Sequence, residues 1–264
     1  MSRGRIERVL ARRLRAGGAI DEGRRPDELI VEEPLEIRLD DRLVATTMRT
    51  PGHDFELAVG LCHNDGLLGD APVVTCRYCG TGSATDTEFN VVSVDTAGLA
   101  PEPPPRLGTT SSSCGICGTT QLDDLTTRLK VIPDHEPWDP SVLLAAVGVV
   151  REHQGLFART GAVHAAASFD RHGAIDIVRE DIGRHNAVDK VVGRLLLDDR
   201  LPASDHGLFV SGRASFEMVQ KAWAAGFEVV IAVSAPSALA VHTAQAAGLM
   251  LAGFVRGDAF NVYT

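Results

Sequence analysis

The sequence predicts an α/β protein with a C-terminal α/β/α domain on a mostly parallel sheet and a smaller N-terminal α+β domain that carries a Cys-x-x-Cys loop. Beyond residue 139, short apolar runs alternate with helical segments of 10 to 13 residues, as in parallel strands joined by helices that cover both faces. Between residues 29 and 95 a two-residue periodicity dominates, which indicates strands. A proline-rich stretch then leads to Cys114 and Cys117.

Chain length and composition allow a substantial core, since 44% of the 264 residues are hydrophobic. The longest apolar run, from Val142 to Val150, is far shorter than the roughly 18 residues that span a bilayer. The start of the chain has no apolar signal region. We therefore expect a cytoplasmic protein without a membrane partner. Five cysteines, an odd number, do not describe a disulfide framework.

Charge is distributed unevenly. The net charge is -9, but residues 1–25 carry eight arginines against three acidic residues, which leaves the remainder at -14. An acidic body argues against a nucleic-acid partner, because phosphate binding needs a basic face. We expect residues 1–28 to form an arginine-rich solvated tail or a fraying helix.

The domain from residue 29 to residue 138 is expected to hold strands, one early helix and the cysteine loop at residues 109–118. Its hairpin turn falls at Asp40-Asp41, and Asn64-Asp65-Gly66 stops the early helix. The predicted strands are Leu29–Glu33, Leu35–Leu39, Arg42–Met48, Val73–Tyr78 and Glu88–Val94, and the predicted helices are Pro51–Leu61 and Thr119–Leu129.

The domain from residue 139 to residue 264 begins after a break in periodicity, with Asp139 as a helix N-cap and Pro140 in the first turn. The predicted helices are Ser141–His153, His185–Leu197, Ser215–Ala225 and Ala238–Ala247. The predicted strands are Ala162–Phe169, Ile175–Arg179, Leu208–Ser211, Val229–Val233, Leu251–Val255 and Phe260–Tyr263.

The cysteine pair Cys114 and Cys117 is the first candidate for chemistry. Such a pair can supply half of a metal site, cycle between dithiol and disulfide, or carry sulfur as a persulfide. A helix predicted to start near Cys117 favours the thiolate. In a second pair, Cys76 and Cys79, 34 residues separate Cys79 from Cys114, a gap too long for a common zinc ribbon. We expect packing or surface positions for these two residues and for Cys62 as well.

His164 is a candidate in the C-terminal half, since zinc nucleoside deaminases carry a His-x-Glu in a comparable place. Position 166 is alanine and no later cysteine pair follows, so we expect neither catalytic zinc nor another resident metal. His164 is then either a hydrogen-bonded core residue or part of a site.

Two strand-to-helix junctions, Ser211–Ser215 and Ser234–Ser237, have small residues that leave backbone amides available to an anion. Arg213 adds a cation suited to phosphate. The cations of this half favour a local positive pocket; they are Arg179, Arg184, Lys190, Arg213 and Arg256.

Seven segments taken together resemble the formate dehydrogenase accessory sulfurtransferase family, FdhD, from about residue 29 to the end. The segments are Glu32–Ile37, Thr50–Gly60, Ser112–Gly118, Thr160–His164, Glu180–Lys190, Ser211–Arg213 and Ser234–Ser237. The resemblance implies a deaminase-like C-terminal domain without zinc chemistry. It also implies that sulfur from a cysteine desulfurase is passed to the bis(molybdopterin guanine dinucleotide) molybdenum cofactor, bound as cargo, for formate dehydrogenase.

By the same resemblance, Cys114 is the persulfide-bearing residue, Cys117 is its partner, and a homodimer is expected. The resemblance also implies a cofactor contact at six residues; these are Phe254, Val255, Arg256, Gly257, Asp258 and Ala259. Ser211, Arg213 and Ser234 complete the predicted contact set. Two other functions share these features: a non-catalytic cofactor-binding chaperone and a thiol-disulfide oxidoreductase.

Overall fold

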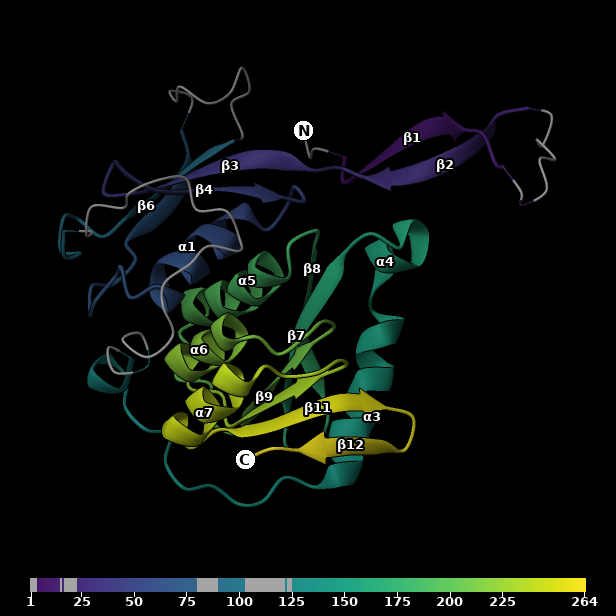
Figure 1. The fold of residues 1–264 in the computed structure, drawn as a ribbon. Coiled ribbons are helices and arrows are strands. Elements are labelled where there is room, and N and C mark those ends of the chain that lie inside the picture. Colours follow the sequence, from purple (N-terminus) through teal and green to yellow (C-terminus); the bar gives the residue numbers. More distant parts are fainter. Residues whose placement is uncertain (1–3, 15, 17–22, 80–89, 103–121, 123–124) are drawn as a thin grey trace.

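The computed structural model describes residues 4–14, 16, 23–79, 90–102, 122 and 125–264, and these residues form three sheets together with the helices given below (Figure 1). The strands are β1 Ile6–Ala11, β2 Arg25–Ile30, β3 Glu33–Leu39, β4 Arg42–Arg49, β5 Thr75–Tyr78, β6 Val91–Asp95, β7 His164–Asp170, β8 Ile175–Asp181, β9 His206–Val210, β10 Val229–Ala232, β11 Met250–Arg256 and β12 Ala259–Val262. The helices are α1 Asp54–Asn64, α3 Pro140–Glu152, α4 Gly155–Thr160, α5 Arg184–Leu197, α6 Phe216–Ala225 and α7 Ala238–Ala247.

The larger sheet has six strands in the order β12-β11-β10-β9-β7-β8. Strands β9, β10 and β11 pair in parallel, whereas β7 is antiparallel to both of its neighbours and β12 is antiparallel to β11. The prediction of a mostly parallel sheet is therefore wrong, and the sheet is mixed. The reason is that short turns join β7 to β8 and β11 to β12, and such a turn reverses the chain, whereas a helical crossover keeps its direction.

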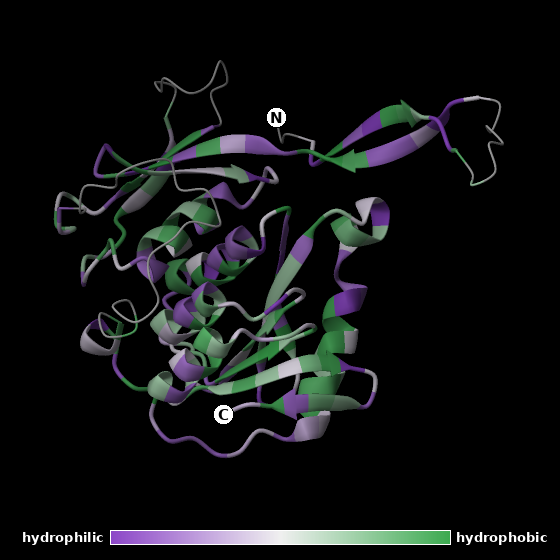
Figure 2. Ribbon diagram, viewed as in Figure 1, coloured by the Kyte–Doolittle hydropathy of each residue, from purple (hydrophilic) through white to green (hydrophobic). Residues whose placement is uncertain are grey.

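Helices cover both faces of this sheet, as the alternating pattern predicts. Helices α5, α6 and α7 lie on one face and α3 on the other (Figure 1). Strand β10 is buried along its whole length and is apolar throughout, as expected for a strand between two helical layers (Figure 2).

The smaller sheet has four strands in the order β4-β3-β6-β5, and α1 packs on it. On its other side α1 crosses α5 closely, because two glycines lie at the crossing. A Cβ atom on Gly60 would lie 1.9 Å from the Asp189 carbonyl oxygen, and one on Gly193 would lie 1.8 Å from that of Glu56. The helix crossing thus joins the two sheets into one packed body.

Helix α1 begins at Asp54, three residues later than predicted from Pro51. Gly52 and His53 both have positive φ angles, 101° and 57°, which are incompatible with a right-handed helix. The Asp54 carboxylate accepts a hydrogen bond from the Gly52 amide at 3.0 Å and stabilises this bend.

The described residues of the N-terminal segment form two strands, not a solvated tail or a helix, so that prediction is wrong for them. Strands β1 and β2 pair antiparallel from Ile6 with Ile30 to Ala11 with Arg25 and form a hairpin that projects from the body (Figure 1). The predicted strand at residues 29–33 also divides, since β2 ends at Ile30 and β3 begins at Glu33.

The start of the C-terminal half agrees with its prediction. The Asp139 carboxylate accepts a hydrogen bond from the Ser141 amide at 2.8 Å, and Pro140 opens α3. The short helix α4 was missed. The exact domain boundaries and the deaminase-like character of this half stay predictions.

Among the described residues, no helix combines the length and the apolar character needed to cross a bilayer.

Candidate functional site

Three loops meet at one edge of the larger sheet, where the parallel strands β9, β10 and β11 end. The Ser234 amide donates to the Gly212 carbonyl at 3.3 Å, and the Phe254 amide donates to the Ser234 carbonyl at 3.2 Å. A parallel bridge also joins Ala214 and Pro236. The structure therefore brings three of the predicted contact segments side by side, at Ser211–Arg213, at Ser234 and at the end of β11. We call these three loops the carboxyl edge.

The predicted contact segment at residues 254–259 forms the end of β11 and the turn to β12. Val255 is fully buried and anchors the segment, whereas Phe254, Arg256, Gly257, Asp258 and Ala259 are exposed. The Arg256 guanidinium lies 5.9 Å from the centre of the Phe254 ring, a cation–π distance. An aromatic face and a guanidinium are thus available to a ligand at this turn.

Two long helices begin at the carboxyl edge. Ser215 stands at the N-cap of α6 and makes no side-chain cap, whereas the Ser237 hydroxyl caps α7 by accepting from the Ala240 amide at 3.2 Å. The first amides of a helix lack partners within the helix and carry partial positive charge. Each junction is thus a strand, a short loop and a helix start, as the sequence predicts, and anion binding there stays a prediction.

His164 lies at the same edge, because β7 runs antiparallel to β9 and begins opposite the end of β9. Its ring nitrogen Nδ1 lies 3.4 Å from the Ser211 hydroxyl oxygen. Burial lowers the pKa of His164, and the neighbouring Arg184 and His185 side chains lower it further, against a smaller opposing effect of Asp181. At neutral pH the ring is therefore uncharged, half-buried and hydrogen-bonded, next to the site.

Two of the five cations that were expected to form a positive pocket bind carboxylates inside the fold instead. Arg179 donates to the Glu56 carboxylate at 2.8 Å, and Lys190 donates to the Asp181 carboxylate at 2.6 Å while only 1% exposed. Both charges are used inside the fold, so their assignment to a ligand pocket is wrong. Arg213 and Arg256 are exposed at the carboxyl edge.

Asp181 is a site-positioning residue that the sequence reasoning missed. One carboxylate oxygen accepts from the Gly183 amide at 2.8 Å and the Asn186 side chain at 3.0 Å, and the other from the Thr50 amide at 3.2 Å. The Glu180–Lys190 segment is a charged cluster in the sequence, but the nine-residue spacing of Asp181 and Lys190 does not by itself indicate a buried ion pair. The pair fixes the loop before α5 against the N-terminal sheet.

The predicted catalytic residues Cys114 and Cys117 lie outside the described residues. Cys62 is buried in the core around α1, which is the packed one of the two positions expected for it. Cys76 and Cys79 occupy half-buried positions, and burial, with a smaller effect of Cys79, raises the pKa of Cys76 to about 12. Within the part of the chain that the structure describes, no three His, Cys, Asp or Glu side chains gather as metal ligands do.

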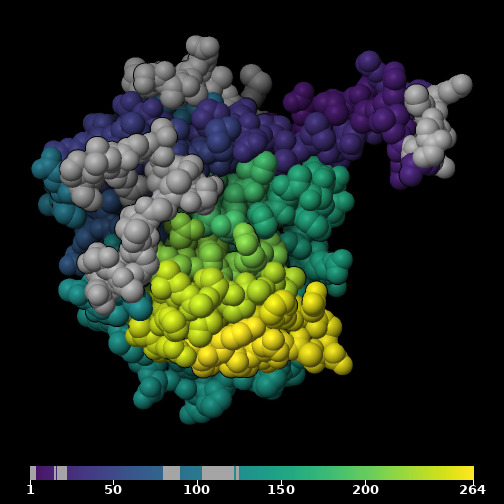
Figure 3. Space-filling view, in the orientation of Figure 1, coloured from purple at the N-terminus to yellow at the C-terminus, as the bar shows by residue number. Residues whose placement is uncertain are grey.

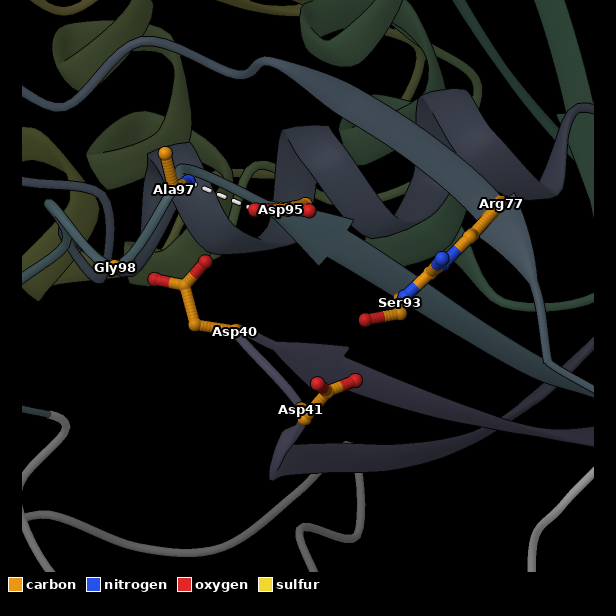
Figure 4. A pocket seen from close by; sticks show the side chains of 7 residues that line it. All are labelled: Asp40, Asp41, Arg77, Ser93, Asp95, Ala97 and Gly98. Atoms are coloured by element: carbon orange, nitrogen blue, oxygen red, sulfur yellow. Dashed lines mark hydrogen bonds between the residues drawn. The ribbon is translucent and has the colours of Figure 1, made fainter.

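A pocket of about 180 Å³ lies in the smaller sheet, by the β3–β4 turn (Figure 4). Asp40 and Asp95 contribute carboxylates to it, but both already accept hydrogen bonds from residues 96–98: Asp40 from Thr96, and Asp95 from Ala97 at 2.7 Å. These carboxylates therefore stabilise a turn.

Known proteins similar to this chain identify its family. The model of the FdhD/NarQ family matches residues 30–264. The chain belongs to the FdhD/NarQ family. A protein of Corynebacterium efficiens named sulfur carrier protein FdhD is 46% identical over 248 residues, which cover 90% of each chain. A Mycobacterium tuberculosis protein of the same name is 48% identical over 253 residues, 91% of each chain.

A solved structure has the same fold as this FdhD/NarQ chain. It is described as a formate dehydrogenase accessory protein from Desulfotalea psychrophila, with a TM-score of 0.77 over 99% of this chain and 97% of the other. Its sequence identity is 21%, so this likeness establishes the fold. The resemblance drawn from the seven sequence segments is thus confirmed.

Proposed function

We propose that this protein is a sulfurtransferase that accepts persulfide sulfur on Cys114 from a cysteine desulfurase. It then passes that sulfur to the bis(molybdopterin guanine dinucleotide) molybdenum cofactor, before the cofactor enters formate dehydrogenase. The transfer takes place in the cytoplasm.

The observation that carries the proposal is the similarity, over about 90% of the chain, to proteins named sulfur carriers. Cys114 and Cys117 stand in a glycine-flanked Cys-x-x-Cys, which suits a thiol that must reach both a donor and an acceptor. A thiolate takes up sulfur by attacking the outer sulfur of a donor persulfide, which is ordinary thiol exchange.

The carboxyl edge supports the second half of the proposal. The cofactor has two guanosine diphosphate-like arms, each with a pyrophosphate. Amides at helix starts and planar arginine cations are the groups that bind such anions. Arg213, in the loop before α6, and Arg256, at the end of β11, are both exposed. The Phe254 ring next to Arg256 offers a face for a base to stack on.

Sulfur release can proceed without an external oxidant. The Cys117 thiolate attacks the inner sulfur of the Cys114 persulfide, the bond between the two sulfurs of the persulfide breaks, and hydrosulfide leaves towards the metal. The outer sulfur gains two electrons, the two cysteine sulfurs lose two electrons in forming a disulfide, and a thiol reductant must then restore the dithiol.

The test is intact mass after incubation with a cysteine desulfurase and cysteine. We expect a gain of about 32 Da, one sulfur atom, that dithiothreitol removes and that Cys114→Ala abolishes. Cys62→Ala, which changes a buried thiol, is the matched control and should keep the adduct.

Formate dehydrogenase activity, measured in cells that lack the native protein and express each variant, then distinguishes the three candidate functions. Loss of activation by Cys114→Ala supports the sulfurtransferase. Full activation by that variant would instead identify a cofactor-binding chaperone. A disulfide that cycles with thioredoxin, without any sulfur adduct, would identify an oxidoreductase.

A further inference from the structure

Gly212 leaves a space at the carboxyl edge that a side chain could fill. Its φ angle is not positive, so the backbone conformation does not require glycine. A Cβ atom on Gly212 would lie 3.5 Å from two ring atoms of His164 and 3.9 Å from Cδ of Arg184, which are ordinary contact distances. The space between these three residues therefore accepts one methyl-sized atom, and we call it the Gly212 space.

Arg184 has a buried nitrogen without a partner beside this space. Its Nε is bonded to the Cδ atom that borders the space, and this nitrogen is buried and makes no hydrogen bond. Among the described residues, the Arg184 guanidinium takes part in no ion pair. Most buried polar groups in folded proteins are hydrogen-bonded, so a buried N–H of a cation that lacks a partner indicates a missing ligand.

Ser215 supplies a second unpaired donor at the same edge. It stands at the N-cap of α6, where a serine hydroxyl usually accepts a hydrogen bond from the first turn. Its side chain makes no such cap, and its Oγ is buried without a hydrogen-bond partner in the described residues. The hydroxyl can therefore donate to a ligand, at a helix start that favours negative charge.

The charges around the Gly212 space favour an anion. The Glu217 carboxylate of α6 is bound by the His185 ring, and the Asp181 carboxylate is ion-paired inside the fold. Burial and the nearby Arg184 hold the pKa of His164 below its ordinary value, so that ring is uncharged at neutral pH. The cation of Arg184 is thus left to attract a negative ligand.

The exposed side of the same edge suits a larger ligand. Arg213 and Phe254 are exposed there, and Figure 3 shows the green to yellow part of the chain, from α5 to β12, as one continuous surface. The Gly212 space, by contrast, lies between a half-buried histidine and a buried nitrogen of Arg184. The two sides of the edge therefore differ in the size of ligand that they accept.

We propose that the Gly212 space binds hydrosulfide, the anion released from the Cys114 persulfide, and holds it beside the bound cofactor. This inference rests on the proposed function for the origin of the ligand. A sulfur atom is about as large as a methyl group, so hydrosulfide fits where a Cβ atom would, and Arg184 and Ser215 donate to it. Hydrosulfide released into water would diffuse away, whereas a bound anion reacts within one complex.

Calorimetric titration of the full chain with sodium hydrosulfide, without oxygen, tests the site. The reference protein is Cys114→Ala/Cys117→Ala, in which the reactive thiols are absent. We expect a dissociation constant of about 1 mM or below. Gly212→Ala fills the space and should weaken binding at least about tenfold, and Arg184→Met and Ser215→Ala should weaken it as well. Sodium bromide, also a single-atom anion, should compete, and sodium phosphate should not.

Two matched controls are made in the same reference protein. Gly148→Ala adds a methyl group in α3 where nothing lies within 4 Å, and Arg151→Met removes an exposed arginine from the same helix. Both should bind hydrosulfide as the reference protein does. Thermal unfolding of every variant checks that a loss of binding is not a loss of folding.

Three results would overturn the site. They are no binding by the reference protein at about 10 mM hydrosulfide, unchanged binding by Gly212→Ala, or displacement of hydrosulfide by phosphate, which would identify a phosphate site instead. Failure of the sulfur-transfer proposal shows separately, as a missing mass adduct on wild-type Cys114, because the titration does not use that residue.

Discussion

Single charged residues inside this fold join its elements, and some of them link the two halves. Arg179 of β8 reaches Glu56 of α1, and Lys221 of α6 donates to Asp189 of α5 at 2.7 Å. Asn64 of α1 donates to the same carboxylate at 2.6 Å. Buried charges of this kind are costly unless they are paired and hydrogen-bonded, so each pair ties the position of one element to another.

We expect the contribution of the Glu56 carboxylate to the free energy of unfolding to be lost in acid. Burial opposes its ionisation, but hydrogen bonds from Arg179 and His53 outweigh burial and lower its pKa from 4.5 to about 2. The stabilisation is therefore fully present above pH 4.5 and is lost as the pH falls from 4.5 towards 2. After allowance for solvent screening we expect about 1 to 2 kcal/mol.

Urea denaturation of wild type and Glu56→Gln between pH 7 and pH 3 measures this contribution. The difference in unfolding free energy between the two proteins should shrink as the pH falls, because other carboxylates titrate equally in both. Glu152→Gln, which removes an exposed carboxylate from α3, should show a constant, small difference. A pH-independent difference for Glu56→Gln would contradict the assignment.

At the scale of elements, the crossing of α1 and α5 controls how the sheets pack. The sequence could not predict it, because Gly60 and Gly193 look like ordinary weak points in two helices. Helix α7 and the Asp139 cap were predictable since their signals are local. The β1–β2 hairpin was not, because its strands are separated by 13 residues and its arginines suggested a solvated segment.

Alanine substitutions at three helical glycines test the crossing. Gly193→Ala would place its methyl group 1.8 Å from a backbone oxygen, and we expect it to lower the unfolding free energy by about 2 kcal/mol or more. Gly148→Ala in α3 has nothing within 4 Å and should raise it by about 0.5 to 1 kcal/mol. Gly60→Ala should behave like Gly193→Ala. Equal small effects in urea denaturation at all three positions would refute a close crossing.

At the scale of the whole molecule, the carboxyl edge gathers segments that are far apart in the sequence. The sequence predicted that Ser211, Arg213 and Ser234 follow strands, and parallel neighbours bring such residues together. Two hairpins made the rest of the sheet antiparallel, which apolar periodicity alone does not reveal. Arg179 and Lys190 were assigned to a pocket because charge does not show which partner a folded chain supplies.

Guanosine diphosphate should protect the three loops of the carboxyl edge together. In hydrogen–deuterium exchange we expect slower exchange at residues 211–215, 234–237 and 254–259, and no change in the β1–β2 hairpin. Arg213→Ala should weaken binding about tenfold by calorimetry, since a good charge-assisted contact contributes about 1.4 kcal/mol. Arg200→Ala, away from this edge, is the control, and protection confined to one loop would count against a shared nucleotide site.

The seam between α1 and α5 has a practical consequence for anyone who would study the cofactor half alone. A fragment starting at residue 139 would expose the surface of α5 around Gly193 to solvent. It would also leave Asp189 without its hydrogen bond from Asn64, and Asp181 without its hydrogen bond from the Thr50 amide. Such a truncated fragment should misfold, so point substitutions in the intact chain are the sounder way to separate the two proposed activities, sulfur carriage and nucleotide binding.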